Sequence, residues 1–233
     1  MISLGLPKSL IFIRHGETDF NRVFDLREKS EKTIEGIIKN GDFNIELNVH
    51  GIGQAIRLGK YLARLNKFDC LYYSPYKRTA QTKDIIVQYL GYPIECFEDI
   101  RLSERDMGLI YGMHRQEIVD KFTEVAKQRE KTESFLFRPP SGESCADVMI
   151  RIDRFLSDIC YEQCQKNILV ISHLLPILLS RMILDNYGYP TYIPSISNGE
   201  RPSNCSMTIY EPANDKLKLR GYNLTDHLNE VEK

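Results

Sequence analysis

Short apolar runs alternate along the chain with longer stretches of helical periodicity. The short runs are bounded by turn residues and predict five strands, at residues 10–13, 70–73, 94–97, 168–171 and 206–210. Apolar residues recur at helical spacing between these runs, and they predict helices over residues 52–62, 85–90, 148–159 and 174–184. Strands and helices that alternate in this way indicate an α/β domain with a largely parallel sheet.

Polar residues mark where three of the helices should begin. Asn48 can accept a hydrogen bond from the first turn of the helix that follows it. Ser144, with Asp147 three residues later, resembles a capping box. Ser74 precedes Pro75, so we expect Ser74 to cap a helix that has proline at its first position.

Two stretches interrupt the alternation of strands and helices. Residues 22–47 are rich in charge and glycine, and residues 106–140 contain one amphipathic helix followed by a polar run. Both stretches are typical of excursions from a core that overhang a site. For a chain of 233 residues, we expect a single domain over 1–233 with a cap insert at about 106–140 and a variable excursion at about 22–47.

The charge of the chain argues against some classes of partner. It has 31 Lys and Arg residues against 32 Asp and Glu residues, a net charge of -1, whereas proteins that bind nucleic acids or anionic membranes show a basic excess. No apolar run approaches the roughly 20 residues that cross a bilayer. We expect no nucleic-acid partner, no membrane partner, and a cytoplasmic protein whose six cysteines are reduced and mostly buried.

Candidate catalytic residues follow the predicted strands. His15 lies in the run Arg14-His15-Gly16-Glu17-Thr18 after the first strand, and His173 directly follows the strand at 168–171. Ligands of open α/β sheets bind at the carboxyl ends of the strands, so we expect these histidines to meet there. Arg78 falls in the first turn of a predicted helix, where a guanidinium and the helix N-terminus both attract phosphate. The sequence therefore predicts an anion pocket that contains a nucleophile.

Glu104 supplies a candidate proton donor for the same pocket. It follows the strand predicted at 94–97, and a bound phosphate dianion would raise the pKa of its carboxyl by like-charge repulsion. A neutral imidazole can attack phosphorus while arginines neutralise the phosphoryl oxygens, so the chemistry requires no metal ion in principle. We expect no metal and no cofactor.

Seven motifs occur in order along most of the chain. They are Arg14-His15-Gly16-Glu17-Thr18-x-x-Asn21, Asn48-x-x-Gly51-x-x-Gln54-Ala55, Ser74-Pro75-x-x-Arg78-x-x-Gln81-Thr82, Leu102-x-Glu104-x-x-x-Gly108-x-x-x-Gly112, Pro140-x-Gly142-Glu143-Ser144, Val170-x-Ser172-His173 and Asn204-Cys205-Ser206. Taken together, the sequence resembles the histidine phosphatase superfamily, also called the phosphoglycerate-mutase-like superfamily, and in particular its phosphatases.

This resemblance implies a fold, a reaction and roles for particular residues. The fold would be a three-layer α/β sandwich with a mostly parallel central sheet flanked by helices, and a small helical cap would cover the phosphate pocket. His15 would become phosphohistidine, and Glu104 would protonate the leaving alkoxide. The phosphoryl group would be held by Arg14, Asn21, Arg78 and His173.

Departures from the family pattern favour a phosphatase over a phosphoglycerate mutase. Leu174 and Leu175 follow His173 where the family usually has glycine, and the stretch before Gly51 lacks the usual Gly-Trp pair. The extended serine- and asparagine-containing segment that mutases carry after the second histidine is also missing. Within the predicted cap, Arg115 is a candidate for binding a further anionic group of the substrate.

The sequence thus predicts a metal-independent phosphomonoester hydrolase that acts through phosphohistidine on a small phosphorylated substrate. Neither the substrate nor the oligomeric state is specified. Two alternatives stay open: a mutase-type phosphotransferase and a non-catalytic phosphate-binding module. A further mechanism would use Cys145 and Arg151, which have the spacing of cysteine-dependent phosphatases, but no glycine lies between them and they fall on a predicted helix.

Overall fold

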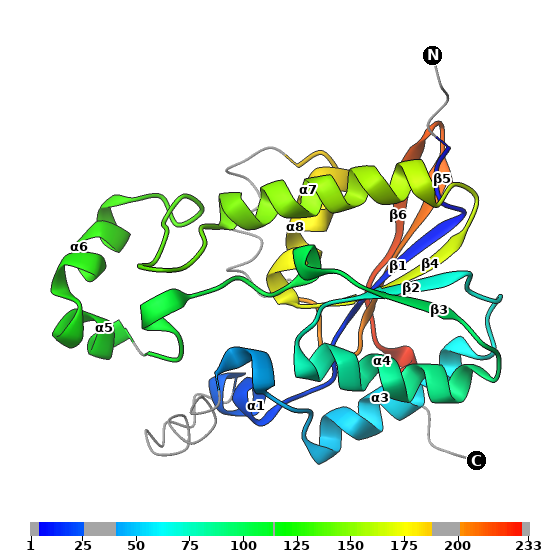
Figure 1. Ribbon diagram of the computed structural model, residues 1–233, viewed down its shortest axis with the longest axis horizontal. Helices are drawn as coiled ribbons and strands as arrows, with labels where there is room; N and C mark the ends of the chain where they lie inside the picture. The colour runs from blue at the N-terminus through cyan, green and yellow to red at the C-terminus, as the bar shows by residue number, and fades with distance from the viewer. Residues whose placement is uncertain (1–4, 26–40, 114, 188–200, 230–233) are drawn as a thin grey trace.

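The computed structural model describes residues 5–25, 41–113, 115–187 and 201–229. At its centre lies a six-stranded sheet in the order β3-β2-β4-β1-β5-β6 (Figure 1). The strands are β1 (Ser9–Arg14), β2 (Cys70–Tyr73), β3 (Glu95–Glu98), β4 (Asn167–Ser172), β5 (Met207–Ala213) and β6 (Lys216–Leu224). The first four strands of the sheet order are parallel, and β5 and β6 extend the sheet antiparallel. The mostly parallel sheet is confirmed, whereas β6 was not predicted.

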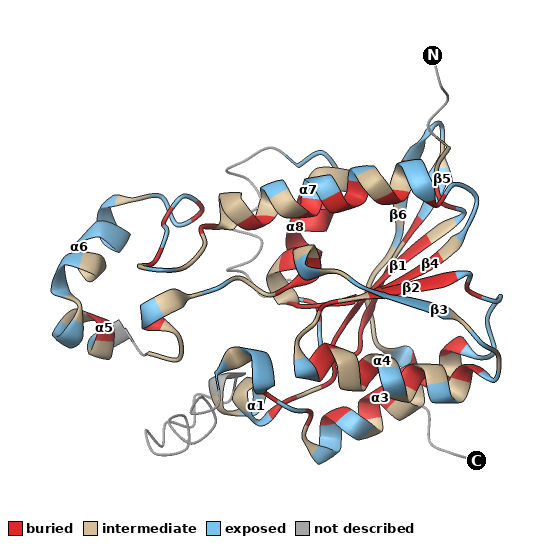
Figure 2. Cartoon of the chain, viewed as in Figure 1, coloured by how far each residue is buried: buried red, intermediate tan, exposed pale blue. Residues whose placement is uncertain are grey.

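Helices cover both faces of the sheet (Figure 1). The pair α3 (Val49–Leu62) and α4 (Lys77–Leu90) lies on one face, and α7 (Cys145–Glu162) and α8 (Leu174–Leu184) lie on the other. Alternate residues of β1 point to opposite faces, so Leu10 and Phe12 pack in one core cluster and Ile11 and Ile13 in the other. The inner strands are buried along almost their whole length (Figure 2). The expected three-layer sandwich is confirmed.

Two of the three predicted helix starts are confirmed. Oδ1 of Asn48 accepts a 2.8 Å hydrogen bond from the N–H of Gly51, in the first turn of α3. Ser144 and Asp147 form the reciprocal bonds of a capping box at the start of α7. Both caps satisfy N–H groups that have no partner within the helix.

The third predicted helix start, after Ser74, is wrong. Helix α4 begins at Lys77, and the residue at its N-cap position is Tyr76, whose side chain makes no capping bond. The Ser74 hydroxyl lies instead 2.8 Å from Nε2 of His173. Ser74 is therefore part of the candidate active site.

The segment 106–140 stands beside the sandwich (Figure 1). It contains η3 (Gly108–Ile110), α5 (Arg115–Lys121) and α6 (Thr123–Lys131). The prediction of one amphipathic helix here is wrong, because the backbone of Phe122 leaves the helical region at φ -138° and ψ 55°. Ile110, Ile118 and Phe137 form a separate buried cluster, so this segment has a small core of its own.

Short elements complete the described chain. They are α1 (Asp19–Asp25), η1 (Asp42–Asn44), η2 (Ile100–Leu102) and η4 (Asp226–Leu228). Of the predicted excursion 22–47, residues 26–40 lie outside the described part of the chain. No helix within the described ranges combines the length and apolar character needed to cross a membrane.

All six cysteines lie within the described residues, and each is a free thiol. Cys70 and Cys205 are buried, whereas Cys96 and Cys164 are exposed and the other two are intermediate. The expectation of reduced cysteines agrees with the structure, whereas the expectation that most of them are buried is wrong, because only Cys70 and Cys205 are.

Candidate active site

Two histidines meet at the carboxyl edge of the sheet. His15 directly follows β1 and His173 directly follows β4, and these strands pair in parallel with Arg14 opposite Ser172. The two imidazole rings lie 5.1 Å apart at an angle of 60°. Arg78, in the first turn of α4, reaches the same place from the end of the neighbouring strand β2. The fold therefore gathers the side chains that the sequence singled out, although they are far apart along the chain.

Hydrogen bonds from three parts of the chain hold the backbone around His15. Its N–H donates to the carbonyl of Ser172 at 3.0 Å, and its carbonyl accepts from Nδ2 of Asn204 at 2.9 Å. The next N–H, of Gly16, donates to Oγ1 of Thr82 at 3.0 Å. The position of the imidazole is thus fixed by residues from β4, from the segment before β5 and from α4.

The start of α3 packs tightly against the residue that follows Gly16. A Cβ atom on Gly51 would lie 2.1 Å from the carbonyl oxygen of Glu17, so only glycine fits at this position. Nδ2 of Asn48 donates to the Glu17 carboxylate at 2.9 Å, and Oε1 of Gln54 accepts from the Glu17 N–H at 2.9 Å. The motif that contains Asn48, Gly51 and Gln54 therefore supports the loop that carries His15.

The protonation of the His15 ring follows from the hydrogen bond that the ring makes with Gly16. Nδ1 lies 2.7 Å from the carbonyl of Gly16, and a carbonyl can only accept, so Nδ1 carries the proton. Nε2 then holds the lone pair, and His15 lines the cavity at this edge of the sheet. Burial, and then the charges of Arg78 and Arg14, lower the pKa of His15 well below its usual 6.5. The imidazole is therefore neutral near pH 7 and nucleophilic at Nε2.

Arg78 and His173 are bonded to each other. Nε of Arg78 donates to Nδ1 of His173 at 3.2 Å, and because a guanidinium cannot accept, Nδ1 must hold a lone pair. Burial, followed by the charge of Arg78, lowers the pKa of His173 well below 6.5. Its proton is then on Nε2, which donates to Oγ of Ser74 at 2.8 Å. Both ring nitrogens of the fully buried His173 are thus engaged within the protein, and the ring orients Arg78.

Glu104 lines the same cavity. Burial raises the pKa of its carboxyl, and the charge of Asp42 acts in the same direction. The N–H of Arg105, which donates to Oε1 at 2.8 Å, and the charges of Arg78 and Arg14 oppose this rise without cancelling it. The carboxyl therefore keeps its proton to a higher pH than an exposed glutamate, as a general acid requires.

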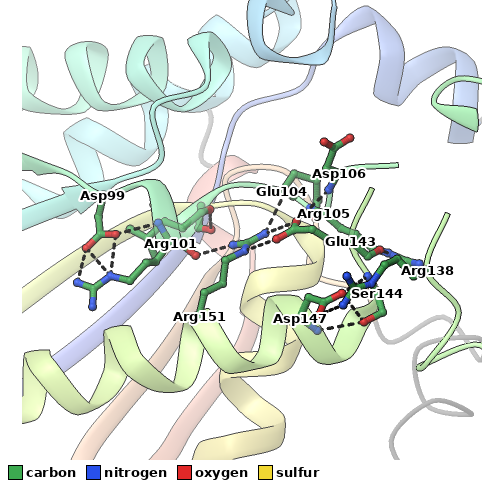
Figure 3. A network of polar contacts seen from close by, with 12 residues as sticks. Asp99, Arg101, Glu104, Arg105, Asp106, Arg138, Glu143, Ser144, Asp147 and Arg151 are labelled. Carbon is green, nitrogen blue, oxygen red and sulfur yellow. Dashed lines mark hydrogen bonds and ion pairs between the residues drawn. The ribbon is translucent and has the colours of Figure 1, made fainter. Parts of the chain in front are cut away.

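A polar network anchors the segment that carries Glu104 to α7 (Figure 3). Arg151 of α7 donates to the main-chain carbonyls of Arg101 at 2.5 Å and Glu104 at 3.2 Å. The same guanidinium binds both carboxylate oxygens of Glu143 at 2.9 and 3.0 Å. Arg105 then donates to the carbonyl of Glu143 at 2.6 Å. These bonds therefore fix the main chain on both sides of Glu104.

The remaining predicted binding residues differ in how they are placed. Nη1 of Arg14 donates to the carbonyl of Pro202 at 2.9 Å, and Arg14 and Asn21 both line the cavity. Oδ1 of Asn21 accepts from Oγ1 of Thr18 at 3.0 Å and from Nδ2 of Asn204 at 3.3 Å. These bonds occupy Oδ1 of Asn21, so the binding of a phosphoryl oxygen by Asn21, which stays a prediction, would use its amide NH₂. The side chain of Arg115 lies outside the described residues, so its role stays a prediction.

A cavity of about 360 Å³ is lined by Arg14, His15, Asn21, Arg78 and Glu104, and this volume is usual for a small-molecule site. Many of the lining residues were not assigned to the site by the sequence analysis, and Asp42 and Leu174 are among them. Oδ1 of Asp42 lies 2.8 Å from Nη1 of Arg78 and accepts a 2.8 Å bond from the hydroxyl of Tyr111. The position of Asp42 in the excursion 22–47, which was expected to overhang a site, is the signal that pointed to it.

The structure does not favour the cysteine mechanism. Burial raises the pKa of Cys145, so its sulfur is a thiol near pH 7. Arg151, its proposed partner, is bonded to Glu143. No group of three or more His, Cys, Asp or Glu side chains among the described residues has the arrangement of a metal site.

Comparison with known proteins identifies the family. A family model described as the histidine phosphatase superfamily (branch 1) matches residues 10–225. The chain belongs to this superfamily. This histidine phosphatase is 26% identical over 227 residues to an uncharacterized phosphatase, PhoE, of Bacillus subtilis, with 95% of the chain and 97% of the relative covered. It is 27% identical over 223 residues to phosphoglycerate mutase-like protein 4 of Arabidopsis thaliana, with 95% and 87% covered.

The fold of the histidine phosphatase also matches solved structures. The crystal structure of the α-ribazole phosphatase of Shigella flexneri superposes with a TM-score of 0.75 at 21% identity, covering 97% of this chain and 100% of that one. The family expected from the seven motifs and the enzyme class, a histidine phosphatase, are both confirmed.

Proposed function

We propose that this histidine phosphatase is a metal-independent phosphomonoester hydrolase that transfers the phosphoryl group of a small substrate to His15 and then to water. The observation that carries the proposal is the bond between Nδ1 of His15 and the Gly16 carbonyl. It leaves Nε2 as the nucleophile in a ring whose pKa is lowered. Arg14 and Arg78 lie beside it to balance the phosphoryl charge.

In the first step, the lone pair on Nε2 of His15 attacks phosphorus. The bond between phosphorus and the ester oxygen breaks, and its electron pair leaves with the oxygen. The carboxyl of Glu104 donates its proton to that oxygen, so the product leaves as a neutral alcohol. The positive charge that develops on His15 is stabilised by the bond from Nδ1 to the Gly16 carbonyl.

In the second step, water attacks the phosphorus of phosphohistidine. The Glu104 carboxylate accepts a proton from this water, and the electron pair of the N–P bond returns to Nε2. Inorganic phosphate and the original enzyme result. Arg14, Arg78 and Asn21 bind the phosphoryl oxygens in both steps, and His173 orients Arg78. The segment 106–140 acts as the cap of the pocket, and Arg115 is the candidate there for a distal anionic group.

The proposal is tested with wild-type protein and the His15→Ala variant, assayed with p-nitrophenyl phosphate and a panel of sugar phosphates, phosphoglycerates and nucleotides. A chelator is present throughout. We expect the wild type alone to release phosphate. Equal turnover by His15→Ala would overturn the assignment of His15 as the nucleophile. Loss of the wild-type activity in the presence of the chelator would overturn the metal-independent mechanism.

A mutase-type phosphotransferase is the second candidate, and two observations favour it. A relative is named as phosphoglycerate mutase-like, and His15 is only 3% exposed, which limits the access of water to a phosphoenzyme. The two functions differ in the fate of phosphohistidine. In a hydrolase, phosphohistidine loses its phosphoryl group to water at the same rate with or without an acceptor alcohol. In a mutase, phosphohistidine loses this group rapidly only when the acceptor alcohol is present.

A further inference from the structure

Asp42 accepts two hydrogen bonds from Arg78, the arginine that we propose binds the phosphoryl group. A guanidinium has five N–H donors. In Arg78, Nε donates to His173, and Nη1 donates both to the main-chain carbonyl of Asp42 at 2.7 Å and to its Oδ1 at 2.8 Å. The ring of Tyr76 lies 4.7 Å from the guanidinium carbon. Nη2 is therefore the nitrogen of Arg78 that is left to bind phosphoryl oxygens.

The carboxylate of Asp42 is held where it is. Its Oδ1 also accepts from the hydroxyl of Tyr111 at 2.8 Å, and the ring of Tyr111 stacks on Phe20 at 5.6 Å. The side chain of Asp42 is only 19% exposed. After burial, the negative charge of Asp42 contributes to the raised pKa of Glu104. A fixed negative charge thus lies beside Arg78 and acts on Glu104.

The rest of the cavity wall is largely apolar. The alcohol half of a substrate whose phosphoryl group reaches His15 lies against the side chains of Phe20, Val23, Met107, Met113, Leu174 and Leu175. The last two follow His173 in the first turn of α8. Carbon surfaces of this kind stabilise apolar groups in proportion to the area that leaves water.

Among the described residues, the cations that line the cavity besides the proposed phosphate-binding Arg14 and Arg78 are poorly placed to bind a carboxylate beside the ester oxygen. Arg105 donates to the carbonyls of Phe137 and Glu143 at 2.7 and 2.6 Å. Arg129 and Arg201 also line the cavity, but both are exposed, so water and salt screen their charge. A carboxylate next to the phosphoryl group would instead meet Asp42.

We infer that the site takes phosphomonoesters of bulky, apolar alcohols or phenols, and that Asp42 is a specificity-determining residue that disfavours alcohols carrying a carboxylate beside the ester oxygen. This inference rests on the proposed hydrolase function. A substrate such as 1-naphthyl phosphate presents only carbon to the wall. A substrate such as 3-phosphoglycerate brings a second negative charge near Asp42, and like charges at close range oppose binding.

The test compares kcat/KM for 1-naphthyl phosphate and 3-phosphoglycerate in the wild type and in Asp42→Asn. The substitution removes the charge and keeps the shape of the side chain. Glu46→Gln is the matched control, because Glu46 is an exposed carboxylate of the same segment that pairs with Lys77. We expect the wild type to prefer 1-naphthyl phosphate by about a hundredfold. Asp42→Asn should reduce this ratio about tenfold by raising kcat/KM for 3-phosphoglycerate, while Glu46→Gln leaves it unchanged. Each variant is assayed at its own pH optimum, so that a change in the protonation of Glu104 does not enter the comparison.

A second variant and a binding measurement make the test independent of one substitution. Met113→Ser removes apolar wall without changing any charge, and it should lower kcat/KM for 1-naphthyl phosphate but not for 3-phosphoglycerate. Inorganic phosphate, used as a competitive inhibitor, should bind Asp42→Asn more tightly than the wild type, because the arginine is then no longer shared with a charge.

The outcomes separate this inference from the function on which it rests. Equal kcat/KM for both esters, or a ratio that Asp42→Asn and Met113→Ser leave unchanged, overturns the substrate class while hydrolysis through His15 stands. Failure of the wild type to hydrolyse either ester or to form phosphohistidine overturns the proposed function, and the inference with it.

Discussion

Nε of Arg78 donates a 3.2 Å hydrogen bond to Nδ1 of His173. We propose that this bond makes His173 a positioning residue, because its other nitrogen is bonded to Ser74 and the ring is fully buried. The direct contact with the phosphoryl group that the family resemblance implies for His173 stays a prediction. Asparagine can place Oδ1 near the position of Nδ1 and accept the same bond. We expect His173→Ala to lower kcat about a hundredfold by releasing Arg78, and His173→Asn to restore most of that loss. Steady-state kinetics of both variants measures the difference.

Equal losses in the two variants would contradict this role for His173. They would indicate that the imidazole itself acts on the phosphoryl group, since asparagine replaces only the bond to Arg78.

If Glu104 is the acid, as we propose, the effect of removing its carboxyl depends on the leaving group. A simple alkoxide needs a proton when it leaves, whereas p-nitrophenolate is stable without one. Glu104→Gln should therefore lower kcat/KM about 10² to 10⁴-fold for an alkyl phosphate and far less for p-nitrophenyl phosphate. Comparable losses for the two esters would show that Glu104 does not protonate the leaving oxygen.

The pH dependence of kcat/KM should follow the two shifted groups. His15 must be neutral and its pKa is lowered, so the acid limb lies below the usual 6.5 of histidine. Glu104 must be protonated and its pKa is raised, so the alkaline limb lies above the usual 4.5 of glutamate. Asp42 favours the protonated form of Glu104, hence Asp42→Asn should move the alkaline limb to lower pH. A profile measured with an alkyl phosphate tests this shift, and an unmoved or raised alkaline limb would refute it.

Two glycines of α3 offer a matched test of the loop that carries His15. A Cβ on Gly51 would lie 2.1 Å from the backbone oxygen of Glu17, whereas a Cβ on Gly53 meets only the flexible end of Arg57 at 3.6 Å. Gly51→Ala should lower the free energy of unfolding by about 1–3 kcal/mol and reduce kcat. Gly53→Ala should raise stability by up to about 1 kcal/mol, because alanine favours helix. Chemical denaturation measures the free energy of unfolding of both variants. Similar values for Gly51→Ala and Gly53→Ala would contradict the packing argument.

Sequence periodicity predicted the central layers well because the inner strands are buried on both faces. Strands β1 and β4 are continuous apolar runs. Helices α3, α4 and α7 bury one face each, and α8 is buried on nearly all sides. Strand β6 was missed although Lys216, Lys218 and Arg220 alternate with leucines, a pattern typical of an edge strand.

The features that were missed depend on contacts between distant segments. Ser74 precedes proline, as a helix cap often does, but its hydroxyl is hydrogen-bonded to His173, which lies 99 residues further along the chain. Asp42 meets Arg78 and Tyr111, which lie 36 and 69 residues further along the chain. No local pattern encodes these pairings. The residues expected at the site, such as His15 and Glu104, were found because strand ends and family motifs both mark them.

Direct detection of phosphohistidine tests the central claim of this account. The protein is mixed with substrate, quenched within milliseconds to seconds in alkali, where phosphohistidine survives, and digested for mass spectrometry. The account predicts a phosphorylated peptide with the modification on His15, absent from His15→Ala and accumulating in Glu104→Gln when p-nitrophenyl phosphate is the donor. Turnover by the wild type with no phosphorylated His15, or with the phosphoryl group on another residue, would contradict it.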